Sequence, residues 1–295
     1  MVHLNKEAAG SRRRRSSLAD LVGNMSYEVM PFKNTEQDVV DHIPVTVPLT
    51  VTVTEAKGIE TTLNLTERLL GHGYRVSPHL PARQFTDDQH VADVVARLAE
   101  AGVTSVFVIG GDAPEPAGQF VDAFGLLQAM ERAGHSFEQV GIGGYPEGHG
   151  VIPQEAIELA LKQKAPMATR ILTQICFDTG ATGHWAAGVE NSGVELPVFV
   201  GMPGPVTRQK LIRISAGIGL GQSARFLQKQ QSLFWRFLLP GAYNPTKLVK
   251  RLAVAAPKTA NNIAGLHIFT FNELRKTEVW RQRLLSSIPE KDDRS

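Results

Sequence analysis

The residues best suited to chemistry stand in or directly after short apolar runs. Glu28 lies within one of these runs, immediately before Val29-Met30-Pro31. Burying a carboxylate in an apolar strand is costly unless it is paired, and burial raises the pKa of a carboxyl group. Such a group is suited to general acid catalysis near neutral pH. The alternative interpretation places Glu28 at the rim of the fold, in a salt bridge.

Further polar residues end other apolar runs. Asp112 follows Gly110-Gly111, a sequence that is also typical of a simple turn. Gln174 ends a later run, and its amide offers a donor and an acceptor together, which suits a planar amide-like ring as well as a hydrogen-bonded place in the core. Four more candidates at the ends of runs are Thr54, His79, Tyr145 and His149.

A metal site is not predicted. His79 and His149 lack a ligand spacing such as H-x-x-x-H, so we expect core or hydrogen-bonded histidines. Cys176 is the only cysteine, which excludes a disulfide within the chain and a cysteine metal cluster. We expect its thiol to be buried and unreactive. The glycine-rich segment 217–221 follows no predicted strand and lacks the G-x-G-x-x-G spacing of a dinucleotide-binding turn.

Eight apolar runs alternate with helical patterns along most of the chain. In one helical pattern, Val91, Val94, Val95 and Leu98 share a face at i, i+3, i+4 and i+7 spacing. Apolar strands separated by helices predict a parallel sheet, and eight such units fit an α/β protein of the (β/α)₈ TIM-barrel type; a doubly wound open sheet is the alternative. The active site of such a barrel lies at the C-terminal ends of its strands, so the polar residues would meet at one mouth. The predicted strands are 26–30, 49–53, 75–80, 105–109, 139–143, 170–174, 196–200 and 266–271.

The chain divides into a barrel and two short tails. We expect a mobile basic tail at 1–24, a catalytic barrel at 25–287 and a polar C-terminal tail at 288–295. Segment 218–251 would be a helical insertion before the last strand. Four apolar residues of this insertion either pack on the outer helices or form a lid or a subunit contact. These residues are Phe234, Trp235, Phe237 and Leu238.

Composition argues against several classes of protein. Apolar residues make up 42% and charged residues 20% of the 295 residues, as in ordinary globular proteins. The 31 basic and 29 acidic residues nearly balance, so nucleic-acid binding is not predicted, and apolar runs long enough to span a membrane are absent. The apolar stretch behind the arginine run 12–15 is too short for a twin-arginine signal. We therefore expect a cytoplasmic protein with a solvated tail.

Seven motifs, in this order, resemble those of the 5,10-methylenetetrahydrofolate reductases. The fourth and the sixth are the most specific. The motifs are Ser26-Tyr27-Glu28-Val29-Met30-Pro31, Pro78-His79-Leu80-Pro81-Ala82-Arg83, Val108-Ile109-Gly110-Gly111-Asp112, Gly144-Tyr145-Pro146-Glu147-Gly148-His149, Leu161-Lys162-Gln163-Lys164, Leu172-Thr173-Gln174-Ile175-Cys176-Phe177-Asp178 and Leu266-His267-Ile268-Phe269-Thr270-Phe271-Asn272.

The resemblance implies a barrel that binds FAD at its mouth. In such enzymes NADH or NADPH reduces the flavin, which passes hydride to methylenetetrahydrofolate and yields 5-methyltetrahydrofolate. The resemblance implies that Glu28 helps to protonate N10 of the folate and that Asp112 and Gln174 bind the pterin. It also implies a homo-oligomer. The implied flavin contacts are Thr54, His79, Gly111, Asp112, Tyr145 and His149, with Lys162 or Lys164 near the cofactor phosphates.

Four segments depart from the family pattern, mostly on the flavin side. Gly110 stands where many members have an arginine that helps to bind the flavin. Segment 164–169 lacks the aspartate and glycine of the usual turn. Thr54 is followed by Glu55-Ala56-Lys57 rather than Tyr-Gly-Ala, and Asn272 is followed by Glu273 rather than arginine.

Three functions follow from this pattern of matches and departures. The leading one is a flavin-dependent reductase with weakened or rearranged FAD binding. The second is a flavin-free reductase that takes hydride directly from a nicotinamide, and the third is a folate-binding subunit without redox activity. Glu28, Asp112 and Gln174 together argue against the third. The choice of NADH or NADPH, the direction of the reaction, and a role in methionine synthesis or in one-carbon disposal stay open.

Overall fold

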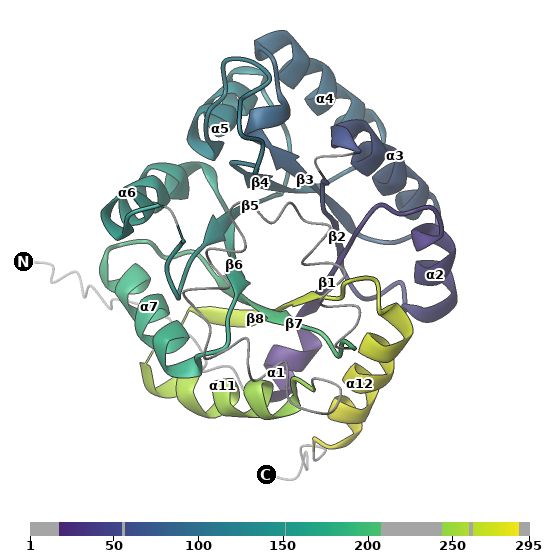
Figure 1. The fold of residues 1–295 in the computed structure, drawn as a ribbon, viewed down its shortest axis with the longest axis vertical. Coiled ribbons are helices and arrows are strands. Elements are labelled where there is room, and N and C mark those ends of the chain that lie inside the picture. The colour runs from purple at the N-terminus through teal and green to yellow at the C-terminus, as the bar shows by residue number, and fades with distance from the viewer. Residues whose placement is uncertain (1–17, 55–56, 151, 208–243, 260–261, 289–295) are drawn as a thin grey trace, which may run out of the picture.

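Eight parallel strands close into a barrel in chain order, each paired with the next and β8 paired with β1 (Figure 1). The computed structural model describes residues 18–54, 57–150, 152–207, 244–259 and 262–288. The closed barrel confirms the predicted (β/α)₈ fold over the open sheet. The strands are β1 (Met25–Val29), β2 (Leu49–Val51), β3 (Val76–Pro81), β4 (Ser105–Ile109), β5 (Gln139–Gly144), β6 (Arg170–Ile175), β7 (Val198–Pro203) and β8 (Ile263–Phe269).

Helices surround the barrel on its outer side (Figure 1). Three of them begin at an aspartate whose side chain accepts backbone N–H groups of the first turn: Asp87, Asp122 and Asp178. The helices are α1 (Leu18–Gly23), α2 (Thr35–His42), α3 (Gly58–Gly71), α4 (Asp88–Glu100), α5 (Ala123–Arg132), α6 (Gln154–Lys164), α7 (Thr179–Asn191), α11 (Thr246–Thr259) and α12 (Leu274–Ser286), with short 3₁₀ turns at Ala82–Gln84 and Ala165–Met167. No helix in this described part of the chain is long and apolar enough to cross a membrane.

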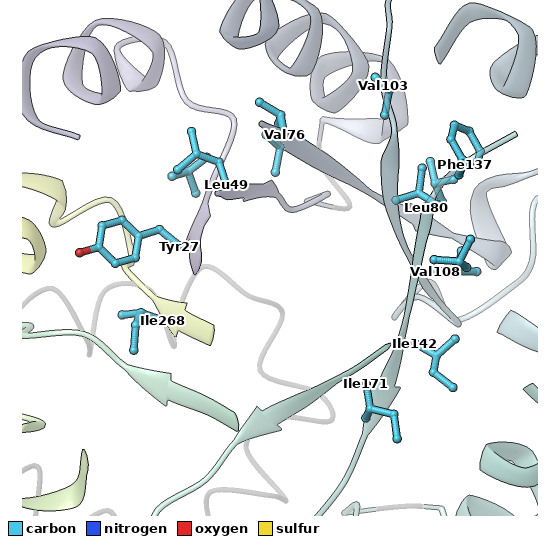
Figure 2. Close-up of a cluster of buried hydrophobic side chains, with 14 of the residues drawn as sticks. Tyr27, Leu49, Val76, Leu80, Val103, Val108, Phe137, Ile142, Ile171 and Ile268 are labelled. Carbon is cyan, nitrogen blue, oxygen red and sulfur yellow. The ribbon is translucent and has the colours of Figure 1, made fainter. Parts of the chain in front are cut away.

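The apolar core lies between the strands and the helices. Figure 2 shows side chains such as Leu49, Val108 and Ile171 arranged around the barrel on the side that faces the helices. Successive side chains of a strand point to opposite faces. Tyr27 and Val29 of β1 are fully buried in this outer core, so Glu28 between them points into the barrel.

The N-terminal boundary of the barrel differs from the prediction. The sequence predicts a mobile tail up to residue 24, but Leu18–Gly23 forms α1, which packs against β8. Its Leu21 and Val22 are fully buried. Burial of these two side chains explains why the helix belongs to the barrel rather than to a solvated tail.

The C-terminal end of the barrel also differs in detail. The last strand ends at Phe269 rather than at residue 271, because Phe271 and Asn272 adopt positive φ angles of 50° and 55°. Segment 208–243 lies outside the described residues. It includes the glycine-rich segment 217–221 and the four apolar residues of the predicted insertion, whereas α11, which follows it, packs against α7.

Candidate active site

Glu28 lies between two buried histidines inside the barrel. Its Oε2 is 3.7 Å from Nε2 of His79 on β3 and 3.8 Å from Nε2 of His267 on β8. Burial raises the pKa of the Glu28 carboxyl. The strand-embedded carboxyl therefore has the perturbed acidity that the sequence predicts.

The two histidines are neutral partners rather than cations. Both imidazoles are almost completely buried. Burial lowers the pKa of His79 to about 4 and that of His267 to about 3. At neutral pH neither ring carries a charge, so the contacts with Glu28 are not ion pairs. A neutral environment of this kind favours the protonated form of the carboxyl group.

Polar side chains also fill the end of the barrel below these histidines. The Arg170 guanidinium on β6 donates to the hydroxyl oxygens of Ser77 and Ser105 and to Oε1 of Gln139. The interiors of (β/α)₈ barrels are usually packed with branched apolar residues. The polar group of Arg170, Ser77, Ser105 and Gln139 is called the barrel floor below.

Two residues that follow β8 hold the end of β1. The Thr270 hydroxyl donates to the backbone carbonyl of Glu28 over 2.6 Å. The Asn272 side chain forms two hydrogen bonds with the backbone of Met30 and donates a third to the Thr35 hydroxyl. These contacts hold the backbone at Glu28 and Met30, and so fix the direction in which the Glu28 side chain projects from β1. The sequence pattern does not predict this role for Asn272.

Three predicted site residues meet at the mouth. The rings of Tyr145 and His149 make an edge-to-face contact with centroids 5.3 Å apart. Burial raises the pKa of Tyr145 and lowers that of His149. The nearby Asp112 carboxylate adds to the rise in the pKa of Tyr145 and offsets part of the fall in the pKa of His149. The structure thus brings together residues from the loops after β4 and β5.

Arg83 organises the loop that carries Asp112. Its guanidinium donates to the backbone carbonyls of Ala113, Pro114 and Val121. Gly111, at the start of this loop, has a positive φ of 89°. A Cβ there would lie 2.9 Å from Cβ of Pro81. The loop therefore needs glycine at this position and Arg83 along its length.

Glu147 connects the loops after β5 and β6. One of its carboxylate oxygens accepts the backbone N–H groups of both Phe177 and Asp178. Asp178 in turn caps α7. The sequence did not predict this contact, and the signal available was that both partners belong to the two most specific motifs, the fourth and the sixth.

The remaining predicted site residues lie at separate places around the barrel. Gln174 is exposed at the end of β6, and its Oε1 accepts the N–H of Ile175. Thr54 follows β2 and is partly exposed. Lys162 is exposed on α6, whereas Lys164 is buried, which lowers the pKa of its ammonium.

The one thiol of the chain, that of Cys176, lies in the interior. Cys176 is buried, as predicted, and burial raises the pKa of its thiol to about 12. Within the ranges that the structure describes, no three His, Cys, Asp or Glu side chains gather in a way that could hold a metal ion.

A comparison with known families identifies the chain. The family model of methylenetetrahydrofolate reductase matches residues 15–219. The chain belongs to this family. A curated relative, methylenetetrahydrofolate reductase 2 of Saccharomyces cerevisiae, is 26% identical over 128 residues, which is 40% of this chain. The match spans about a fifth of the yeast protein, 21% of its length.

Solved structures resemble this reductase-family chain in fold only. A Yersinia pestis DHPS with a bound pterine–sulfa conjugate is 13% identical with a TM-score of 0.46, covering 90% of this chain and 94% of that one. A phosphonomutase-like protein from Burkholderia cenocepacia is 12% identical with a TM-score of 0.48, covering 85% and 88%. Likenesses at this level carry no argument about substrate.

Proposed function

We propose that this protein reduces 5,10-methylenetetrahydrofolate to 5-methyltetrahydrofolate, with hydride that originates from NADH or NADPH. The observation that carries the proposal is Glu28, a carboxyl group inside the barrel whose pKa is raised by burial. Glu28 gives its proton to N10 of the folate, which breaks the bond between N10 and the methylene carbon. The iminium ion at N5 then accepts hydride at that carbon and becomes the N5-methyl group.

Asp112 and Gln174 are proposed to bind the pterin. Both are exposed, and they follow β4 and end β6 respectively. An amide and a carboxylate together can pair with the donors and acceptors of a pterin edge. Gln174→Ala is expected to weaken folate binding about 5- to 150-fold if a buried pterin group loses its partner. Unchanged affinity would contradict the assignment.

The source of the hydride depends on how well FAD fits this chain. FAD, when bound, relays hydride from the nicotinamide to the folate. Tyr145 and His149 are proposed to contact the flavin ring, but of the two lysines expected near the diphosphate only Lys162 is exposed. Gly110 has no side chain, Lys164 is buried, and Arg83 already donates to three carbonyls.

The smaller number of cations for the diphosphate, with glycine at position 110 and Lys164 buried, supports a second form of the function. In it, the nicotinamide lies over the mouth and passes hydride directly to the folate. Glu28 would do the same work in either form, because protonation of N10 precedes hydride transfer in both. The cytoplasmic location and the homo-oligomer stay predictions.

One experiment tests the reaction and distinguishes its two forms. The protein is purified, its visible spectrum is recorded, and NADH or NADPH oxidation is followed with and without methylenetetrahydrofolate. Folate-dependent oxidation by a colourless protein supports direct transfer, and a yellow protein that NADH bleaches supports the flavin route. Absence of folate-dependent oxidation under either condition would overturn the proposed reductase.

The role of Glu28 is tested in the same assay. Glu28→Gln keeps the size of the side chain but cannot donate an acidic proton. Turnover is expected to fall by about 10²- to 10⁴-fold, the usual contribution of a general acid, while folate binding changes little. Normal turnover of this variant would remove Glu28 from the mechanism.

A further inference from the structure

His267 has a buried ring nitrogen that lies close to the acid. The side chain is 1% exposed, and its Nε2 forms no hydrogen bond. The Glu28 carboxyl lies beside it, with Oε2 3.8 Å from Nε2. A buried polar atom without a partner is uncommon and requires an explanation. A shift of less than about 1 Å would bring the two atoms within hydrogen-bond distance, and such contacts often tighten when substrate binds.

The other nitrogen of the His267 ring is already engaged. Its Nδ1 lies 2.9 Å from the hydroxyl oxygen of Ser26. Ser26 is on β1, two residues before Glu28, and it pairs in register with His267 across the junction of β1 and β8. One strand therefore supplies both the acid and the hydroxyl group that orients the imidazole.

Burial, with a smaller contribution from nearby charge, keeps the His267 ring neutral. Among the described residues, the titratable groups facing Glu28 are His79 from β3 and His267 from β8. Thr50 on β2 and Phe269 on β8, its cross-strand neighbours, are uncharged. Behind His267, the Arg170 guanidinium of the barrel floor adds to the effect of burial in lowering the pKa of the imidazole. A neutral imidazole has one N–H donor and one acceptor nitrogen.

We propose that His267 is a positioning residue for the acid: Ser26 donates its hydroxyl proton to Nδ1, which leaves the Nε2–H aimed at Oε2 of Glu28. The imidazole keeps its proton throughout. When Glu28 gives its own proton to N10, the Nε2–H donates a hydrogen bond to the carboxylate that remains. Because this bond is stronger to the anion than to the neutral acid, it lowers the barrier to proton transfer more than it stabilises the resting state.

This inference rests on the proposed function, and it gives a role to His267, to which the family resemblance assigned none. Without the Nε2–H, Glu28 would be a weaker acid with a higher pKa. Proton transfer to N10 would be slower, while the contacts that bind the folate at the mouth would be unaffected. The signature is thus a change in kcat with little change in KM.

The experiment compares His267→Phe, which keeps an aromatic ring, with His267→Gln, which keeps an N–H donor. For His267→Phe we expect kcat to fall by about 10- to 100-fold, KM for folate to change less than about twofold, and the alkaline fall in kcat to move to higher pH. His267→Gln is expected to recover part of kcat. His72→Phe, at an exposed histidine that ends α3, is the matched control and is expected to leave kcat unchanged. An unchanged kcat in His267→Phe would overturn the proposal.

A second measurement uses the unaltered protein and does not depend on turnover. Imidazole ¹⁵N NMR shows which ring nitrogen of His267 carries the proton. A proton on Nε2 supports the proposal, and a proton on Nδ1 contradicts it. If Glu28→Gln proves fully active, the proposed reductase mechanism fails, and this tautomer measurement still decides whether His267 donates towards Glu28.

Discussion

The Asn272 side chain is bound to the backbone of Met30 at two atoms. Its Oδ1 accepts the Met30 N–H over 2.8 Å, and its Nδ2 donates to the Met30 carbonyl over 3.0 Å. The two residues come from opposite ends of the chain, and the contact exists because β1 and β8 are neighbours in the closed barrel. Beyond the end of β8, the Asn272 amide thus pairs with the backbone next to β1 as a neighbouring strand would.

This contact predicts a specific loss of stability. Asn272→Ala removes the hydrogen bonds and also puts a less tolerant residue at a positive φ of 55°. We expect the free energy of unfolding to fall by about 2–4 kcal/mol. Asn272→Gly removes the same bonds but adopts this φ easily, so its loss should be about 1 kcal/mol smaller. Urea unfolding measures both, and a change within about 0.5 kcal/mol for Asn272→Ala would contradict the structural role.

Two adjacent glycines in the loop after β4 give a matched pair of variants. Gly111→Ala is expected to destabilise the protein by about 1–3 kcal/mol, because the residue has a positive φ and its Cβ would approach Pro81. Gly110→Ala has open space and no positive φ, so it should be nearly neutral. Thermal and urea unfolding of the two variants side by side tests this difference, and equal stabilities would show that the loop adapts.

Glu147 is expected to position the loop that follows β6, next to Gln174. Glu147→Ala leaves the N–H groups of Phe177 and Asp178 without their carboxylate acceptor. The free energy of unfolding should fall by about 1–3 kcal/mol, and KM for folate should rise more than kcat falls. Glu115→Ala, at an exposed position in the loop after β4, is the control. If both variants behave alike in unfolding and in kinetics, Glu147 does not organise the site.

The raised pKa of Glu28 predicts how stability depends on pH. Above the ordinary glutamic acid pKa of 4.5, the unfolded chain releases the Glu28 proton while the folded protein retains it. Unfolding is therefore favoured increasingly as the pH rises from about 4.5 to the folded pKa, and the effect levels off above that value. Glu28→Gln removes this dependence.

Urea unfolding of both proteins between pH 4 and pH 8 measures this linkage. The parent is expected to lose stability relative to Glu28→Gln across that window. A parent that instead gains stability relative to the variant as the pH rises would show that the Glu28 pKa is lowered on folding, and would remove the physical basis for its role as an acid.

The sequence by itself determined the barrel and placed Glu28 in its first strand. Apolar runs at strand spacing, alternating with helical patterns, predict eight parallel units, and the first of these runs contains Glu28. Polar residues at the ends of strands predicted the mouth for a similar reason, since parallel strands bring those ends to one side. These are local patterns, and burial enforces each of them independently.

Only the tertiary structure decided what surrounds Glu28. Contacts of Glu28 with His267, and of Met30 with Asn272, require β8 to return beside β1, and no local pattern encodes which atoms then face one another. The same holds for Glu147, whose partners lie in the next loop, and for α1, whose two buried residues look like part of a polar tail until β8 covers them. Hydrogen bonds are short and directional, so their partners depend on the exact placement of segments that are far apart in the sequence. The apolar pattern of a single strand does not specify that placement.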